Sequence, residues 1–194
     1  MRRAFVVGLW AVLLAAASSG ATAASLLSEE AASSLLKRGG VTLLLRHGQT
    51  EPGLGDPPGF RLDDCSTQRN LSSAGREALR DMAARNVQRG ILFERVFTSA
   101  WCRCRDTAKL LATDARTVND WPALNSQFAG NPVDAESNTQ VVARVRTVPT
   151  SERWLMVTHQ VNITALTGVV PSMGEGVLVT RAASGLRVLG VVRL

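Results

Sequence analysis

Short apolar runs alternate along the chain with longer amphipathic stretches, which is the pattern of strands that alternate with helices. The predicted strands cover residues 41–45, 95–98, a short segment near 118, 154–158, 177–180 and 186–194. The predicted helices cover residues 26–37, 72–89, 101–112, 141–148 and 161–167. This order predicts an α/β fold, a three-layer αβα sandwich whose central sheet is mostly parallel. The last two strands are expected to pair as an antiparallel hairpin at one edge.

The helix at 72–89 has clear start and stop signals. Ser72 is a good N-cap, and Gly90 follows the last turn. Four apolar residues are expected on one side of this helix, namely Leu79, Met82, Ala83 and Val87. The preceding stretch, residues 51–58, is rich in glycine and proline and predicts a loop.

The first 23 residues have the features of a signal peptide. A basic start at Arg2 and Arg3 precedes the apolar run Ala4–Ala17, and Ala21–Ala23 fits a small-x-small cleavage site. The apolar run is shorter than the roughly 20 residues that a membrane-spanning helix needs. We therefore expect residues 1–23 to be removed and residues 24–194 to form one periplasmic or secreted domain without a stable membrane span. The alternative is that residues 1–23 stay attached as an uncleaved membrane anchor.

Composition and charge narrow the possible functions. The chain is 45% hydrophobic and 20% charged, which is typical of one globular domain. It has 22 basic and 16 acidic residues, but the basic residues are scattered rather than clustered. Nucleic-acid-binding proteins concentrate basic charge on one face, so no nucleic acid is expected as a partner. A few arginines that bind a small anionic substrate account equally well for the surplus of basic over acidic residues.

Three cysteines, Cys65, Cys102 and Cys104, are expected to form one disulfide and leave one thiol in an exported protein. Cys102 and Cys104 lie two residues apart on a predicted helix and point to different sides, so Cys65 is expected to pair with one of them. Their C-x-C spacing is not the C-x2-C spacing of zinc sites. We expect no metal ion.

Both histidines of the chain directly follow predicted strands. His47 comes after the strand at 41–45, and His159 comes after the strand at 154–158. Ligands of open α/β sheets bind at the carboxyl ends of the strands, so the two histidines are expected to share a site. A lone histidine is more often a structural residue, but two at the same edge favour function.

Arginines accompany these histidines. Arg46 precedes His47, and Arg103 and Arg105 lie on the predicted helix after the strand at 95–98. A guanidinium group binds phosphate through two parallel hydrogen bonds, which points to a phosphorylated substrate. Arg103 and Arg105 are about 200° apart around a helix, so at most one of them faces the pocket.

Four segments in order resemble the histidine phosphatase superfamily, which has the phosphoglycerate-mutase-like fold. Residues 44–48 are similar to its Arg-His-Gly motif, and residues 70–76 to the segment that opens its first helix after the loop. Residues 98–108 resemble the element that carries its second arginine, which corresponds to Arg103. Residues 157–159 match its second histidine. The resemblance covers residues 41–194.

This resemblance implies a phosphatase of phosphomonoesters that works outside the cytoplasm and needs no metal ion or cofactor. His47 would form a phosphohistidine that water hydrolyses, while Arg46, Arg103 and His159 would surround the transferring oxygens. The exported branch of the family also implies a disulfide between Cys65 and Cys102. Some exported relatives act on phosphates of the lipopolysaccharide core, which makes such a small phosphorylated molecule a candidate substrate.

The general acid of many relatives is missing from its usual place. These relatives carry a glutamate after the second arginine, whereas the acids of this region lie in no familiar context; they are Asp114, Asp120, Asp134 and Glu136. Gln160 stands where another branch has aspartate. Glu175 is the candidate acid, although a solvated surface glutamate is the alternative. Two further functions within the family are a phosphatase of protein phosphohistidine and a mutase.

A different class of function therefore stays open, that of a non-catalytic phosphate- or phosphosugar-binding protein with a degenerate pocket. The sequence carries no code for the substrate in the loops at 51–63 and 124–136, and it predicts no oligomeric state.

Overall fold

The computed structural model describes residues 24–112, 117–127 and 135–193. The predicted signal peptide at 1–23 lies outside the described residues, as do Asp114, Asp134 and Leu194. The helices of the described part are α1 (Glu29–Arg38), α2 (Ser73–Gln88), α3 (Cys102–Leu111), α4 (Ala135–Arg146) and α5 (Gln160–Thr167). The strands are β1 (Val41–Arg46), β2 (Arg95–Thr98), β3 (Val118–Asp120), β4 (Arg153–Thr158), β5 (Gly176–Arg181) and β6 (Leu186–Val192). Two 3-10 turns lie at Cys65–Thr67 and Pro122–Leu124.

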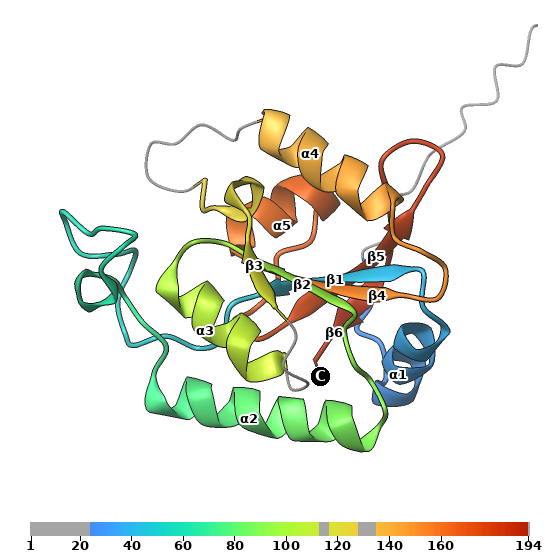
Figure 1. Ribbon diagram of the computed structural model, residues 1–194, viewed down its shortest axis with the longest axis horizontal. Helices are drawn as coiled ribbons and strands as arrows, with labels where there is room; N and C mark the ends of the chain where they lie inside the picture. The colour runs from blue at the N-terminus through green and yellow to red at the C-terminus, as the bar shows by residue number, and fades with distance from the viewer. Residues whose placement is uncertain (1–23, 113–116, 128–134, 194) are drawn as a thin grey trace, which may run out of the picture.

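The strands form one sheet in the order β3-β2-β4-β1-β5-β6 (Figure 1). The first four strands in this order are parallel to one another. β5 runs antiparallel to its neighbour β1, and β6 runs antiparallel to β5. The expected hairpin at the sheet edge is therefore confirmed. Because β1 and β4 are adjacent and parallel, with Arg46 opposite Thr158, their carboxyl ends open at the same place. This register brings the segments after both strands together.

Helices cover both faces of the sheet, which confirms the three-layer αβα architecture (Figure 1). Successive strand residues alternate between the two faces, because side chains along a strand point in opposite directions. Leu43 and Leu45 of β1 thus pack in the core beneath α1, α2 and α3, while Leu44 packs in the core beneath α4 and α5. In the described part of the chain no helix is long and apolar enough to cross a membrane.

Two predicted helix boundaries are wrong. Helix α1 starts at Glu29 rather than at Leu26, because the Ser28 hydroxyl caps it by accepting the Ala31 N–H. Leu26 instead forms a bridge with Val191. Helix α4 starts at Ala135 and ends at Arg146, whereas the predicted range was 141–148. Its first turns are polar and lack the apolar periodicity on which the prediction relied.

The predicted inner face of α2 is correct except at one residue. Leu79, Met82 and Ala83 are buried, but Val87 is 50% exposed. Val87 stands about 80° round the helix from Leu79, and this rotation turns it toward solvent. Asn86 is buried in the last turn instead. The N-cap is as predicted, since the Ser72 hydroxyl accepts the Gly75 N–H at 3.0 Å.

The start of α2 is packed directly against the segment that follows β1. The Ser72 N–H donates to the Gln49 carbonyl at 3.0 Å, and a Cβ atom at Gly75 would lie 2.1 Å from the same oxygen. That distance is far below a van der Waals contact, and the neighbour is backbone. Glycine at this position therefore lets the helix hold the loop next to His47.

Gly75→Ala should reverse the usual preference for alanine in a helix. Alanine ordinarily stabilises a helix over glycine by about 1 kcal/mol. Here the added methyl group must displace the 48–50 segment, and overpacking of this kind costs about 1–3 kcal/mol in the free energy of unfolding. Chemical denaturation measures the change. Ala78→Gly, at an exposed position of the same helix, is the control and should cost about 1 kcal/mol. A stabilised Gly75→Ala variant would contradict the close approach.

Candidate functional site

The two histidines meet at the carboxyl edge of the sheet, as predicted. His47 directly follows β1, and His159 directly follows β4 and occupies the N-cap position of α5. The His47 N–H donates to the Thr158 carbonyl at 3.1 Å, which ties the two strand ends together. The ring centroids lie 5.5 Å apart in an edge-to-face arrangement. Both side chains are buried.

The hydrogen bond of the His47 ring fixes which nitrogen carries the proton. Nδ1 lies 2.9 Å from the Gly48 carbonyl oxygen. A carbonyl only accepts hydrogen bonds, so Nδ1 must donate, and Nε2 keeps its lone pair. The Gly48 N–H in turn donates to Thr107 Oγ1 at 3.0 Å, which anchors this segment on α3. The imidazole is thus oriented as a nucleophile through Nε2.

Both imidazoles are uncharged at neutral pH. Burial, and then the positive charges of Arg103, Arg46 and Arg69, lower the pKa of His47 to about 3, although the hydrogen bond to Gly48 acts in the opposite direction. Burial also lowers the pKa of His159 far below its usual value, and the neighbouring His47 and arginines add to this effect. A nucleophilic histidine has to be neutral, and this site keeps it so.

Three arginines surround the histidines, of which two were predicted. Arg46 donates through Nη1 to Gln160 Oε1 at 2.7 Å and to the Pro171 carbonyl at 2.9 Å. Arg103 lies on the first turn of α3, and its side chain is only 5% exposed. Arg69 was not predicted as a site residue. It directly precedes the 70–76 segment that the sequence had singled out, and this proximity was the available signal.

The Nε–H groups of Arg46, Arg69 and Arg103 are all buried without a hydrogen-bond partner among the described residues. Burial and the neighbouring positive charges lower the pKa of both Arg46 and Arg69. Unsatisfied buried donors and crowded positive charges are both costly in free energy. An anion with several oxygens relieves both costs, which fits the predicted phosphate.

One carboxylate also lies in the site, and the sequence analysis missed it. Asp56 accepts hydrogen bonds from Arg103 Nη1 at 2.7 Å, from the Arg69 N–H at 3.0 Å and from Trp101 Nε1 at 2.9 Å. Burial acts to raise the pKa of this carboxyl, but these hydrogen bonds outweigh burial and lower it. Asp56 comes from the glycine- and proline-rich loop, where no periodicity indicates which way a side chain points.

These groups line a cavity of about 470 Å³. Three arginines, the two histidines and Asp56 are joined there by the aromatic rings of Phe60 and Trp101. Within the described part of the chain no three His, Cys, Asp or Glu side chains are grouped to hold a metal ion.

The structure also separates the candidates that the sequence left open. Arg105 points away from the cavity and pairs with Asp120, with Nε 3.0 Å from Oδ1, so Arg103 is the arginine of the site. Glu175 does not line the cavity. Its carboxylate accepts the Ser172 N–H at 2.8 Å and pairs with Arg193.

Burial acts to raise the pKa of the Glu175 carboxyl, but the hydrogen bond from the Ser172 N–H and the pairing with Arg193 outweigh it and lower the pKa. Because Glu175 lies outside the cavity, it does not suit the role of general acid that the sequence suggested.

The disulfide between Cys65 and Cys102 is confirmed, with Cα atoms 5.7 Å apart. It joins the end of the loop that carries Asp56 to the first residue of α3, next to Arg103. Cys104 is the free cysteine of the described residues. Burial raises the pKa of its thiol to about 12, so it is no competing nucleophile.

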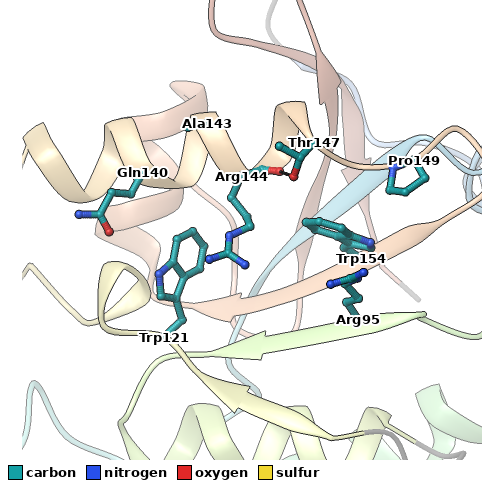
Figure 2. A pocket seen from close by; sticks show the side chains of 8 residues that line it. All are labelled: Arg95, Trp121, Gln140, Ala143, Arg144, Thr147, Pro149 and Trp154. Atoms are coloured by element: carbon teal, nitrogen blue, oxygen red, sulfur yellow. Dashed lines mark hydrogen bonds between the residues drawn. The ribbon is translucent and has the colours of Figure 1, made fainter.

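A second and larger cavity, about 650 Å³, lies between α4 and the strands β2 and β4 (Figure 2). Arg144 stacks on Trp121 at 4.7 Å from the ring centroid, and Arg95 stacks on Trp154 at 5.2 Å. None of the described residues that line it is a histidine or a carboxylate. It therefore lacks the paired histidines and the carboxylate that line the smaller cavity.

An α/β sheet with neutral histidines and unsatisfied arginines at its carboxyl edge offers a site suited to a phosphate-like anion. Residues 42–134 match the family model described as the histidine phosphatase superfamily (branch 1). In this segment the chain resembles the histidine phosphatase superfamily. No curated protein is significantly similar to it in sequence.

Solved structures share the fold. The mycobacterial glucosyl-3-phosphoglycerate phosphatase Rv2419c, in complex with VO3, is 19% identical with a TM-score of 0.57, over 78% of this chain and 96% of that chain. The protein histidine phosphatase SixA complexed with tungstate is 15% identical with a TM-score of 0.56, over 78% and 95%. A phosphoserine phosphatase from Entamoeba histolytica, in complex with 3-phosphoglyceric acid, is 13% identical with a TM-score of 0.54, over 78% and 95%.

The depressed pKa of His47 predicts a pH-dependent stability. The unfolded chain binds a proton on this histidine near pH 6.5, but the folded protein does so only near pH 3. Stability from the neutral imidazole is therefore fully present above about pH 6.5 and falls by about 1.4 kcal/mol per pH unit below it.

Urea denaturation of the parent and of His47→Asn at about pH 7.5 and pH 5.5 isolates this contribution. The parent should lose about 1.4 kcal/mol more than the variant over this interval, because other titrating groups are common to both. Equal losses would mean that folded His47 titrates normally.

Proposed function

We propose that the protein is a phosphatase that hydrolyses phosphomonoesters through a phosphohistidine on His47, without a metal ion, outside the cytoplasm. The observation that carries this proposal is the Nε2 lone pair of a neutral His47 in a cavity lined by three arginines. The match of residues 42–134 to the histidine phosphatase family model supports a phosphatase, and the arrangement of these side chains supports the mechanism.

In the first half-reaction His47 Nε2 attacks phosphorus, and the P–N bond forms as the bond to the leaving oxygen breaks. Arg46, Arg69 and Arg103 bind the three peripheral oxygens, where the charge of the transition state is spread. In the second half-reaction water attacks the phosphohistidine, which releases phosphate and restores neutral His47. His159, edge-on to His47, contacts the same phosphoryl group.

The charge of the cavity supports metal independence. In the free protein three arginines and one ionised aspartate line the described cavity, and the histidines are neutral, which leaves two positive charges. A phosphomonoester dianion carries two negative charges. The arginines thus supply the electrostatic stabilisation that a bound cation supplies in many other phosphoryl-transfer enzymes.

Relatives of the fold support a phosphorylated substrate without naming it. Two of the similar structures hold tungstate and VO3, and they are named as a protein histidine phosphatase and a glucosyl-3-phosphoglycerate phosphatase. We propose a small phosphorylated molecule as the substrate of this chain, and a lipopolysaccharide-core phosphate is one candidate.

Two features support a location outside the cytoplasm. The first 23 residues have the composition of a signal peptide. The Cys65–Cys102 disulfide is of a kind that persists in oxidising compartments.

His47→Ala should abolish the hydrolysis of 4-nitrophenyl phosphate, because it removes the nucleophile. The parent protein, quenched after mixing with this substrate, should carry an acid-labile and base-stable phosphoryl group that is missing from the variant. Circular dichroism checks that the variant is folded. Tight binding of phosphate by a parent protein without turnover would support the binding-protein alternative, and near-parent turnover of His47→Ala would rule out the phosphohistidine.

Arg103→Ala should lower kcat/KM by an amount equivalent to about 2–4 kcal/mol of transition-state stabilisation, as the loss of a preorganised donor does. Arg105→Ala is the matched control two residues away. Its side chain pairs with Asp120 outside the cavity, so the expected change is small. Steady-state kinetics of both variants decide the assignment, and a larger effect of Arg105→Ala would contradict it.

A further inference from the structure

The loop between β1 and α2 places one carboxyl group in the catalytic cavity. Asp56 is the only acidic side chain among the described residues that line it. We propose that Asp56 is the general acid and base of the reaction: it protonates the leaving oxygen and then takes a proton from the attacking water. This inference rests on the proposed phosphatase function and supplies a residue that this function lacks.

The position of Asp56 suits the leaving group. The arginine donors and both histidines are buried at the sheet edge, and they fix the phosphoryl group on the inner side of the cavity. Leu54, in the same loop as Asp56, is 94% exposed and marks the open side. The leaving oxygen lies opposite Nε2 of His47 during in-line attack, so the alcohol must depart toward the outer side that this loop borders.

The contacts of Asp56 give it a reason to change its protonation state when substrate arrives. In the structure its carboxylate is paired with Arg103, and its side chain is 7% exposed. A phosphoryl dianion that binds Arg103 takes away this counter-charge and adds negative charge nearby. Both effects favour the protonated carboxyl, since burial and like charges disfavour an ionised acid. The proton comes from solvent or from the monoanionic form of the substrate.

The resulting proton transfers balance over the cycle. As the P–O bond breaks and the P–N bond forms, the Asp56 carboxyl gives its proton to the leaving oxygen, which departs as an alcohol. The Asp56 carboxylate then accepts a proton from the water that attacks the phosphohistidine. Phosphate leaves, His47 is neutral again, and Asp56 gives its proton to solvent or to the departing phosphate as it pairs with Arg103 once more. The net reaction is a phosphomonoester plus water to an alcohol plus phosphate.

Other described carboxylates do not fit this role. Glu175 lies outside the cavity and is held by Ser172 and Arg193, and Asp120 is held by Arg105. Asp56 differs from both in that it is bound by the arginine that also faces the substrate. Its Trp101 contact adds a neutral donor that keeps the carboxyl in place when Arg103 turns to the phosphate.

The test is Asp56→Asn assayed on phosphomonoesters whose leaving groups range from 2,4-dinitrophenol to a simple alkyl alcohol. Asparagine keeps one oxygen for Arg103 and the Arg69 N–H, loses the acceptor for Trp101, and has no acidic proton to give. We expect kcat/KM for the alkyl phosphate to fall about 10²- to 10³-fold, and that for the dinitrophenyl ester less than about 5-fold, because a good leaving group needs no acid. Asp63→Asn, at an exposed aspartate of the same loop, is the control and should match the parent protein.

A second measurement separates catalysis from positioning. Asp56→Asn should accumulate phosphohistidine during turnover of the dinitrophenyl ester, because the water is no longer activated, while the inhibition constant of phosphate changes little. Equal losses for all leaving groups together with weakened phosphate inhibition would overturn the proposal, because Asp56 would then only position Arg103. A parent protein inactive on every ester, or fully active without His47, would overturn the proposed function itself, and this inference with it.

Discussion

Three guanidinium groups lie beside two buried imidazoles, and the properties of the site follow from this concentration of positive charge. Burial and the charges of Arg46, Arg69 and Arg103 keep His47 neutral, and a neutral ring is the form that can attack phosphorus. The same crowding lowers the pKa of Arg46 and Arg69, and it leaves one Nε–H donor of each of the three arginines without a partner among the described residues. Asp56 offsets part of the charge through Arg103. A phosphoryl group offsets the remainder, so recognition and activation of the nucleophile have the same physical cause.

The fold holds these groups together against their repulsion by using parallel strands. β2, β4 and β1 are neighbours, so the segments after them open at one edge of the sheet. Two further restraints place the loop beside this edge. The Cys65–Cys102 disulfide joins the loop to the start of α3, and Gly75 lets α2 approach Gln49 without a side chain between them. These restraints hold the positively charged side chains of the site close together, although the side chains repel one another.

The sequence predicts the parts of the site that follow from regular structure. His47, His159 and Arg46 stand at or just after strand ends, and the strand pattern indicates their shared edge. Arg103 lies in the first turn of the helix that follows β2. Asp56 and Arg69 escape prediction because they lie in a loop whose path is set by long-range contacts, such as the hydrogen bond from the Arg69 backbone to Asp56. Glu175 shows the converse limit, since it lies close in sequence to a strand start but pairs with Arg193 outside the cavity. The predictions that Val87 is buried and that α4 begins near residue 141 are wrong for a related reason. Periodicity does not tell where a helix leaves the core.

The protonation state of His47 in the free protein tests the account most directly. The chain has two histidines, so ¹⁵N NMR of histidine-labelled protein gives two ring systems, and the spectrum of His47→Asn assigns them. The account predicts a neutral His47 ring with its proton on Nδ1 and a bare Nε2 from about pH 8 to about pH 5. A ring that takes up a proton with a midpoint near pH 6.5, or that carries its proton on Nε2, would contradict it.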